Sequence, residues 1–136
     1  MALDIRVLSD TDYDDILVGW WEQWGWEAPS KDFLPDDGRG GFIVYDLDVP
    51  VCAGYMYMTN SKVCWVDWII SNKEYREKPN RKNAINLLID TLTNVGKNMG
   101  CKYVYALIKH GGLVKTYEEL GYLKGDSYTS EMIKIL

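Results

Sequence analysis

The chain carries its strongest helix signal in the stretch NRKNAINLLIDTLTNVGKNMG, residues 80–100. The apolar residues of this stretch recur every three or four positions, which is the spacing of one face of an α-helix. They are Ala84, Leu88, Leu92, Val95 and Met99. Gly100 follows the last of them, as glycine commonly does after a helix C-terminus. The sequence therefore predicts a long amphipathic helix over Asn80–Met99.

Strands are predicted on both sides of this helix, over Val63–Ser71 and Lys102–Ile108, because both stretches are rich in β-branched and aromatic residues. Two strands joined through a helix run parallel with a right-handed crossover. Gly41–Tyr45 and Val51–Thr59 precede them and are linked by short turns, which predicts an antiparallel meander that ends in Val63–Ser71.

The outer parts of the chain complete an alternating pattern. We expect a strand at Ile5–Leu8, a helix over about Asp12–Trp24 and a long loop over Gly25–Gly41. A short helix at Leu113–Leu120 and a final strand at Tyr128–Leu136 follow. The order βαβββαβαβ describes an α/β domain with a mixed sheet.

The composition is that of an ordinary globular protein, with 47% hydrophobic and 26% charged residues in a chain of 136. A net charge of −5 opposes binding to a phosphate backbone, so we expect no nucleic-acid partner. No apolar run approaches the roughly 20 residues that span a bilayer. Three widely spaced cysteines favour a reducing compartment. We expect one cytoplasmic domain, residues 1–136, without membrane contact.

Several kinds of chemistry are excluded by what the sequence lacks. His110 is the only histidine, and there is no HExxH pattern or cysteine pair, so we expect no metal site. No GxSxG motif is present for a serine hydrolase. The glycine-rich run at Gly38–Gly41 lacks the lysine of a phosphate-binding loop and precedes a strand. Metal hydrolase, NTPase and Rossmann functions are therefore not expected.

The junction before the long helix is basic in an otherwise acidic protein. It carries Arg76, Lys78, Arg81 and Lys82. A helix N-terminus presents free N–H groups and the positive end of the helix dipole, so this junction could hold a phosphate or diphosphate. The alternative is a solvated loop, since exposed basic loops are common.

The order of elements and one motif resemble the GNAT family (Gcn-type N-acyltransferases). Members carry an N-x-x-A-x-x-x-Y-E-K-x-G-F stretch, and here Tyr117–Tyr122 reads YEELGY, with His110 and Leu113 at the Asn and Ala positions. Members also carry R/Q-x-x-G-x-G/A before the long helix. This chain has Asn80, Asn83 and Ile85 at the Arg and two Gly positions.

The resemblance implies a GNAT-like fold in which a β-α-β crossover leaves a splayed cleft for acetyl-CoA. The backbone of Ile69, Ile70 and Ser71 is expected to pair with the pantetheine arm and to polarise the acetyl carbonyl. The diphosphate is expected at the basic junction and the first turn of the helix. The residues implied there are Arg76, Lys78, Arg81, Lys82, Asn83 and Ala84.

Two residues are candidates for the proton transfers that acyl transfer to an amine requires. Tyr117 lies where many members keep a tyrosine near the CoA sulfur, and the alternative is a ring that packs into the core. Asp67 lies in an apolar strand where members often keep a carboxylate base. Such surroundings would raise its pKa unless it is paired. A structural ion pair or hydrogen bond is the alternative for Asp67.

An amine acceptor is implied at the tryptophan-rich region. Trp20 and Trp24 with Asp36 and Asp37 could form an aromatic and acidic mouth for a cationic amine. The alternative is a second small hydrophobic core beneath the long loop. The leading hypothesis is an acyl-CoA-dependent N-acyltransferase. Its rival is a GNAT-fold binding module without catalysis, which the absent loop glycines favour, and a homodimer formed through the aromatic surface is compatible with both.

Overall fold

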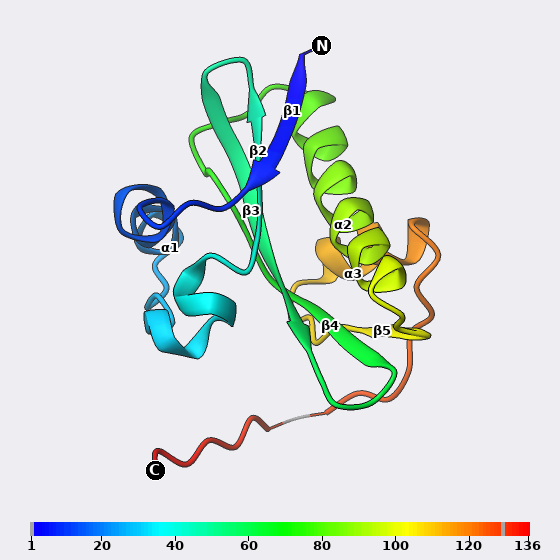
Figure 1. The fold of residues 1–136 in the computed structure, drawn as a ribbon. Helices are drawn as coiled ribbons and strands as arrows, with labels where there is room; N and C mark the ends of the chain where they lie inside the picture. The colour runs from blue at the N-terminus through cyan, green and yellow to red at the C-terminus, as the bar shows by residue number, and fades with distance from the viewer. Residues whose placement is uncertain (1, 129) are drawn as a thin grey trace.

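A five-stranded mixed sheet forms the centre of the molecule in the computed structural model, which describes residues 2–128 and 130–136 (Figure 1). In sheet order the strands are β1 (Leu3–Val7), β2 (Gly41–Asp46), β3 (Val49–Met58), β4 (Val63–Ser71) and β5 (Tyr103–Tyr105). The first four pair antiparallel, and β5 is parallel to β4. The predicted meander, followed by a β-α-β crossover, is confirmed.

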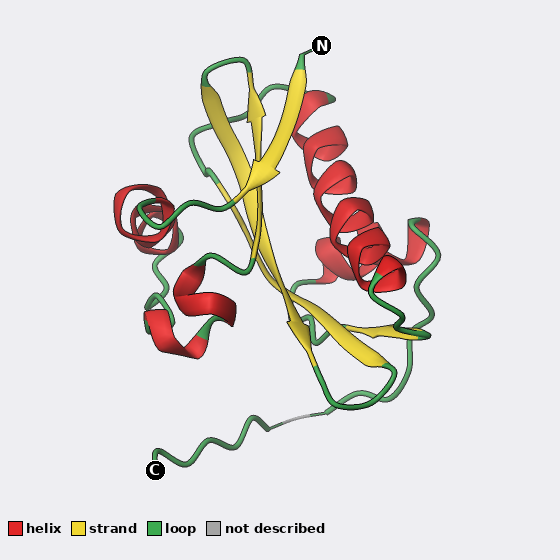
Figure 2. Cartoon of the chain, viewed as in Figure 1, coloured by secondary structure: helices red, strands yellow, loops and turns green. Residues whose placement is uncertain are grey.

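Helices cover the two faces of this sheet (Figure 2). One face is covered by α2 (Asn80–Asn98) and α3 (Gly111–Glu119). The other face is covered by the π-helical turn η1 (Tyr13–Leu17), α1 (Val18–Gln23) and the short 3₁₀ helices η2 (Lys31–Phe33) and η3 (Pro35–Gly38). The predicted helix over about Asp12–Trp24 is thus present as η1 and α1, and the long loop contains η2 and η3.

Each face has its own hydrophobic core. The buried stripe of α2 includes Ala84, Leu88 and Leu92, which pack on Val44 and Val66 of the sheet. On the other face, Trp20 and Trp21 of α1 pack with Ile43 of β2. Both faces are therefore apolar along β2, β3 and β4, which explains why these strands read as near-continuous hydrophobic runs.

Two predicted strands differ from the structure. The strand expected over Lys102–Ile108 is limited to Tyr103–Tyr105, because β4 is its only partner and leaves it after that point. The final strand expected over Tyr128–Leu136 is wrong for Tyr128 and residues 130–136, which form no strand. Thr129 lies outside the described residues. A strand needs a neighbour to pair with, and strand-forming side chains alone do not supply one.

Within residues 2–128 and 130–136, none of the helices combines the length and the apolar character that crossing a membrane requires.

Candidate active site

Strands β4 and β5 separate after three paired residues, and we call this point the fork. The pairs are Val63 with Tyr103, Cys64 with Val104, and Trp65 with Tyr105. Beyond Trp65, β4 continues to Ser71 with no strand of the described residues on that side. The backbone groups on this edge of β4 are therefore available to pair with something other than a strand. The expectation that these two strands splay is confirmed.

A bulge in β4 lies next to the fork. Trp68 has a φ of 57°, in the left-handed region, and the β3–β4 register shifts between Ala53 and Tyr55. The bulge interrupts the alternation of side chains: Val66 faces the α2 core, whereas Trp68 and Ile70 both join the core of the α1 face. A tryptophan in this conformation costs on the order of 1–3 kcal/mol, and such strain is concentrated at functional sites.

Asp67 lies at the fork, beside the bulge. Its carboxylate accepts a hydrogen bond from the backbone N–H of Trp68 at 2.9 Å and another from the backbone of Leu107, which follows β5. Burial raises the pKa of Asp67 above its ordinary value, and these two hydrogen bonds offset only part of that effect. The carboxylate thus bridges the separating strands and holds a proton more readily than an exposed aspartate does.

Tyr117 reaches the fork from α3. Its hydroxyl donates a 3.1 Å hydrogen bond to the carbonyl oxygen of Val66, the first β4 residue beyond the pairs with β5. The residue is only 2% exposed, and its ring packs edge-to-face on Tyr122. Burial and the nearby charge of Asp67 raise the pKa of Tyr117. The structure therefore brings together the two residues that the sequence suggested for proton transfer.

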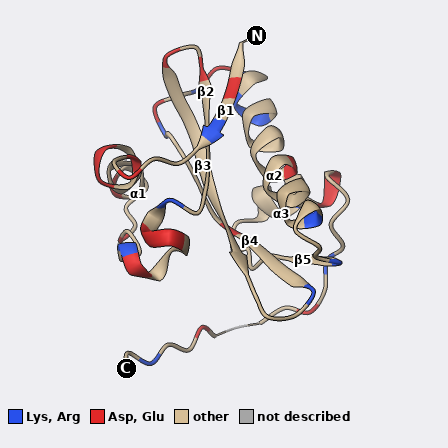
Figure 3. Cartoon of the chain, in the orientation of Figure 1, with Lys and Arg blue, Asp and Glu red and all other residues tan. Residues whose placement is uncertain are grey.

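A basic pocket of about 300 Å³ lies near the Ser71 end of β4. It is lined by Trp24, Lys73, Arg76, Lys78 and Arg81. Figure 3 shows lysine and arginine residues in the loop between β4 and α2, whereas acidic residues are abundant on the helical segments around α1. The pocket therefore concentrates positive charge beside the end of the unpaired β4 edge.

Arg81 holds the walls of this pocket together. Its guanidinium donates to the Ser71 hydroxyl at 2.8 Å and to the carbonyl oxygens of Asn72 and Tyr75 at 3.1 and 2.7 Å. It thus ties the end of β4 to the loop that follows. Arg76 and Lys78 are exposed, and neither forms an ion pair within the described part of the chain.

The other predicted cofactor residues lie along the start of α2. Lys82 forms an exposed ion pair with Glu119 of α3 at 3.1 Å. Asn83 lies in the first turn, and its backbone N–H donates to the carbonyl oxygen of Pro79. Ala84 is fully buried against the sheet, so its side chain belongs to the core of the α2 face.

The structure does not bring together the four residues expected at an acceptor mouth. Trp20 is buried in the core of the α1 face. Trp24 lines the basic pocket, where its indole N–H donates to the carbonyl oxygen of Ser71 at 2.8 Å. Asp36 and Asp37 are exposed on η3, both in the left-handed region. The two tryptophans thus both belong to the core of the α1 face, whereas the two aspartates lie apart from them on η3.

A different aromatic group lies next to Asp67. The Trp68 ring contacts Trp21 and Phe33 edge-on at centroid distances of 6.3 and 5.9 Å. The Tyr57 hydroxyl donates to the carbonyl oxygen of Phe33 at 2.9 Å, and the charge of Asp67 contributes to its raised pKa. Sequence reasoning missed Phe33, Tyr57 and Trp68 as site residues. The only feature of the sequence that could have pointed to any of them is that Trp68 directly follows Asp67, which was already a candidate site residue.

Several solved structures have a fold similar to that of this chain. No family model matches the sequence, and no curated protein does. The aminoglycoside N-acetyltransferase AAC(6')-Iy, solved with a CoA-based bisubstrate analogue, superimposes with a TM-score of 0.69 at 16% identity over 99% of this chain and 100% of that one. A Trypanosoma brucei acetyltransferase gives 0.69 at 15% identity, over 97% and 100% of the two chains.

Glucosamine-6-phosphate N-acetyltransferase from Arabidopsis thaliana is also similar. Its TM-score is 0.65 at 15% identity, over 98% of this chain and 100% of that one. The similarity spans nearly every residue of both proteins, although the sequences have diverged far. The mixed sheet, the crossover through α2 and the fork between β4 and β5 are therefore those of the GNAT acetyltransferase fold.

Proposed function

We propose that the protein is an acyl-CoA-dependent N-acyltransferase, which moves the acetyl group of acetyl-CoA directly to an amine. The fork carries this proposal, because it places Asp67 and Tyr117 beside an unpaired strand edge. Solved structures with the same fold include complexes with CoA and with a CoA-based analogue, which supports acetyl-CoA as the co-substrate.

The unpaired β4 edge and the basic pocket fit the two parts of CoA. The pantetheine arm contains amides, which can form strand-like hydrogen bonds with the backbone of Ile69, Ile70 and Ser71. The diphosphate would then lie in the basic pocket, near Arg76 and Lys78. Lys82 and the first turn of α2, which leads to Asn83 and Ala84, would add positive charge through the lysine and the helix dipole. In this arrangement Arg81 positions the pocket wall through its three hydrogen bonds rather than by contact with phosphate.

The residues at the fork supply what direct transfer requires. The amine nitrogen attacks the thioester carbonyl carbon and forms the amide bond, while the carbon–sulfur bond breaks. Asp67 takes the proton that the amine loses, and its raised pKa brings it closer to the operating pH of a general base. Tyr117 gives its proton to the departing thiolate. The β4 backbone beyond the bulge, at Ile69, Ile70 and Ser71, polarises the carbonyl oxygen, since the N–H of Trp68 is already bonded to Asp67.

The acceptor is proposed to be a small amine bound beside Asp67. Phe33, Tyr57 and Trp68 present aromatic surface there, and aromatic faces with a carboxylate suit a cationic amine. Proteins with the same fold act on aminoglycosides and on glucosamine-6-phosphate, which supports an amine-bearing small molecule.

A CoA titration followed by a turnover assay tests the proposal. CoA at about 100 times its dissociation constant should stabilise the protein by roughly 2.7 kcal/mol in a thermal-shift measurement. Acetyl-CoA with a panel of amines should release free thiol. The variant Arg76→Ala/Lys78→Ala should need a several-fold higher CoA concentration for the same shift, more so at low salt. Lys62→Ala/Lys102→Ala removes two exposed charges elsewhere and should match the wild type.

Each result has a defined meaning. Absence of both a thermal shift and thiol release would refute the acyltransferase proposal. A shift without turnover on any amine would favour a GNAT-fold binding module. Equal CoA affinity in the wild type and in Arg76→Ala/Lys78→Ala would place the diphosphate outside the basic pocket.

A further inference from the structure

Four sulfur-bearing side chains gather where the C-terminal end of α2 lies against β3 and β4. Met58 of β3 and Cys64 of β4 are directly opposite in the β3–β4 register, so their side chains share one face of the sheet. Met56, two residues earlier, lies on the same face. The Cys101 thiol donates to the Met58 sulfur at 3.9 Å and accepts a hydrogen bond from the Cys64 thiol. We call Met56, Met58, Cys64 and Cys101 the sulfur cluster.

A glycine of α2 leaves the space that two of these sulfurs occupy. A Cβ atom at Gly96 would lie 2.5 Å from the Cys64 sulfur and 3.3 Å from the Met56 sulfur. Glycine inside a helix costs roughly 1 kcal/mol relative to alanine. Here it allows the sulfurs to approach the helix backbone, which a larger residue would prevent.

The end of α2 fixes the position of Cys101. Gly100 has a φ of 95°, in the left-handed region, and its N–H donates to the carbonyl oxygen of Lys97 at 3.1 Å. The N–H of Cys101 donates to the carbonyl oxygen of Gly96, also at 3.1 Å. These two hydrogen bonds form a Schellman cap. The cap brings Cys101 beside Cys64, although the two cysteines are far apart in the sequence.

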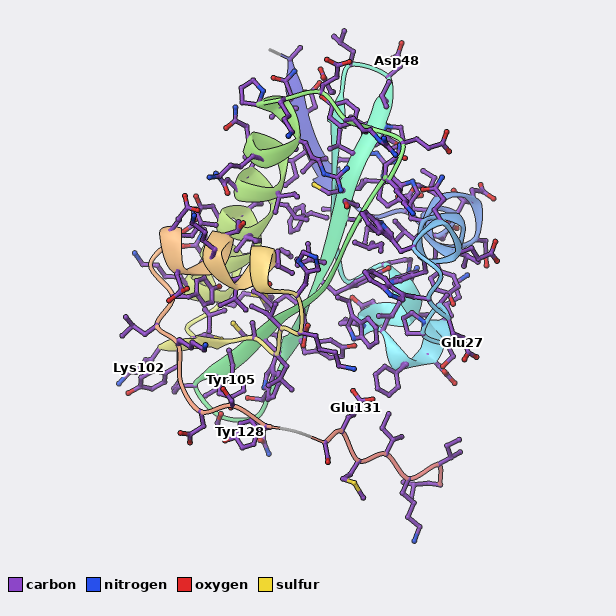
Figure 4. All side chains as sticks on the ribbon, turned by 180° about the vertical axis from the view of Figure 1, so that it is seen from behind. Glu27, Asp48, Lys102, Tyr105, Tyr128 and Glu131 are labelled. Atoms are coloured by element: carbon purple, nitrogen blue, oxygen red, sulfur yellow. The ribbon has the colours of Figure 1, made fainter. Side chains whose placement is uncertain are left out.

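A cavity of about 420 Å³ borders the sulfur cluster. Met56 and Met58 line it, and Met58 is 43% exposed. Cys64 is fully buried, whereas Cys101 is half-buried. Lys102, which directly follows Cys101, is labelled at the edge of the molecule in Figure 4. The cluster therefore has one buried side and one side that an ion can reach.

The four donors suit a soft metal ion. Thiolate and thioether sulfurs together select copper(I), whereas zinc sites use cysteine, histidine and carboxylate ligands. Within residues 2–128 and 130–136, no group of three or more His, Cys, Asp or Glu side chains could hold a metal, so the two thioethers set this cluster apart from a zinc site. Metal–sulfur distances of about 2.3 Å in tetrahedral geometry place two ligand sulfurs about 3.8 Å apart. The separation of the Cys101 and Met58 sulfurs, 3.9 Å, agrees with this value.

We propose that the sulfur cluster binds one copper(I) ion through the thiolates of Cys64 and Cys101 and the thioether of Met58, with Met56 as the fourth sulfur. Two copper–sulfur bonds replace the two thiol S–H bonds, and both protons pass to solvent. The copper stays monovalent, so no oxidant or reductant is consumed. The ion joins β3, β4 and the loop before β5 at the paired end of the fork.

This proposal replaces the expectation of no metal site, which considered only histidines and cysteines close together in the sequence. It does not depend on the acyltransferase function.

Competition for copper provides the first test. The reduced protein is loaded with copper(I) without oxygen and titrated with bicinchoninate, a chelator that reports copper(I) by its colour. The wild type should hold one copper per chain. Cys101→Ser should weaken binding by more than about 100-fold, because loss of a ligand should exceed the roughly 10–100-fold cost of losing an outer-shell partner. Met58→Leu, of similar volume, should weaken binding at least about tenfold.

Two variants are matched controls. Cys52→Ala removes the third cysteine, which is buried toward the other end of β3, opposite Ser71. Met132→Leu changes a methionine that is 88% exposed. Both should keep the wild-type affinity for copper(I). Circular dichroism confirms that every variant is folded.

X-ray absorption at the copper edge provides a second readout and should show only sulfur ligands around the ion. Nitrogen or oxygen ligands in this spectrum would overturn the proposal. So would a wild type that loses copper to the chelator as readily as Cys101→Ser does. Equal copper affinity in Met58→Leu and the wild type would overturn it as well, because the thioether is what favours copper(I) over zinc.

Discussion

Strands β3 and β4 have similar apolar sequences, yet only β4 offers an unpaired backbone edge to the candidate site. β3 is paired with β2 over Val49–Tyr55 and with β4 over Cys52–Met58. β4 is paired with β3 along most of its length, but with β5 only over its first three residues. Buried on both faces and paired on both edges, β3 has no backbone left for a ligand, whereas β4 has an open edge from Val66 to Ser71.

The difference indicates that backbone hydrogen bonding, rather than side-chain composition, distinguishes the closed half of this sheet from the half that borders the candidate site. Substitutions in the closed half should change the free energy of unfolding. Substitutions at the fork should change turnover with little effect on folding.

Asp67→Asn should give the largest effect. General-base catalysis contributes typically 10²–10⁴-fold, so acetyl transfer should fall by about that factor while CoA binding persists. In the wild type, the rate of acetyl transfer should rise with pH as Asp67 loses its proton. This rise should be absent in the variant, because the asparagine side chain does not titrate. Asp48→Asn, in the exposed β2–β3 turn, is the matched control and should keep full turnover.

The stability of Asp67→Asn against pH provides an independent check. The pKa of Asp67 in the folded protein is raised above its ordinary value of 3.8. Below pH 3.8 the residue is therefore protonated in both the folded and the unfolded protein, and it does not change the free energy of unfolding. As the pH rises through the raised pKa, the buried carboxylate increasingly destabilises the folded state. The variant should therefore gain stability relative to the wild type between acidic and neutral pH. A constant difference across that range would show that Asp67 is not perturbed by burial.

Leu88→Ala should give the largest effect in the closed half. Leu88 is fully buried between α2 and the sheet, and such truncations cost about 2–5 kcal/mol. Urea unfolding measures the loss. Leu123→Ala removes the same atoms from a residue that is 96% exposed and should change stability by less than about 0.5 kcal/mol. Similar losses in both variants would contradict the assignment of Leu88 to the core.

Tyr117→Phe should lower the rate of acetyl transfer less than Asp67→Asn does. Loss of the hydroxyl removes the hydrogen bond to Val66 and should lower stability by no more than about 1.5 kcal/mol. Acetyl transfer should fall at least about tenfold across the accessible pH range, because the raised pKa of Tyr117 keeps its hydroxyl protonated throughout. CoA affinity should be retained.

Tyr122→Phe is the control for Tyr117→Phe. Its hydroxyl is hydrogen-bonded to Thr93 of α2 at 2.6 Å, away from β4. This control should lose similar stability but keep its turnover. If Tyr117→Phe turns over as fast as the wild type, Tyr117 is a packing residue and water protonates the thiolate.

Asp12→Asn should give the smallest effect, again in the closed half. Asp12 joins the η1 segment to β1 through Arg6, which donates to both carboxylate oxygens at 2.7 and 3.0 Å. Burial acts to raise the pKa of Asp12, but the hydrogen bonds from Arg6 and Ser9 outweigh it and hold the pKa below 3.8. The ion pair therefore stabilises the fold above pH 3.8, and this contribution is lost as the pH falls through the lowered pKa.

The variant should lose about 0.5–1 kcal/mol at neutral pH, because the Arg6 side chain is 44% exposed, and it should approach the wild type in acid, as measured by urea unfolding across pH. Asp10→Asn, at an exposed neighbouring position, should show no such trend. A loss that is the same at all pH values would mean that the charge of Asp12 is not what stabilises the contact.

The sequence located most of the elements because their patterns are local. The predicted strand Val63–Ser71 has the observed bounds, and the long helix ends within one residue of Met99. The alternating and 3.6-residue periods that support these predictions depend only on neighbouring side chains. Asp67 and Tyr117 were also singled out from sequence, through the apolar run around one and the family motif around the other. Both lie at the fork, and their catalytic roles stay predictions.

The remainder of the site depends on contacts between distant segments. The bulge at Trp68 arises from the register between β3 and β4, so no pattern within β4 reveals that its side chain turns toward Phe33. Trp24 lies beside the basic loop because α1 packs against the end of β4. The contact of Arg81 with phosphate stays a prediction; its hydrogen bonds to the Ser71 hydroxyl and the Asn72 carbonyl oxygen were not foreseen, because they depend on how the end of β4 meets α2.

By itself, the sequence determined the alternation of strands and helices, the amphipathic face of α2 and the strand-forming character of residues 130–136. These properties follow from the spacing and chemistry of adjacent residues. The tertiary structure alone decided where strands pair and where they do not. Backbone hydrogen bonds join residues far apart in the chain, so the fork beside Asp67 exists only once the sheet has formed.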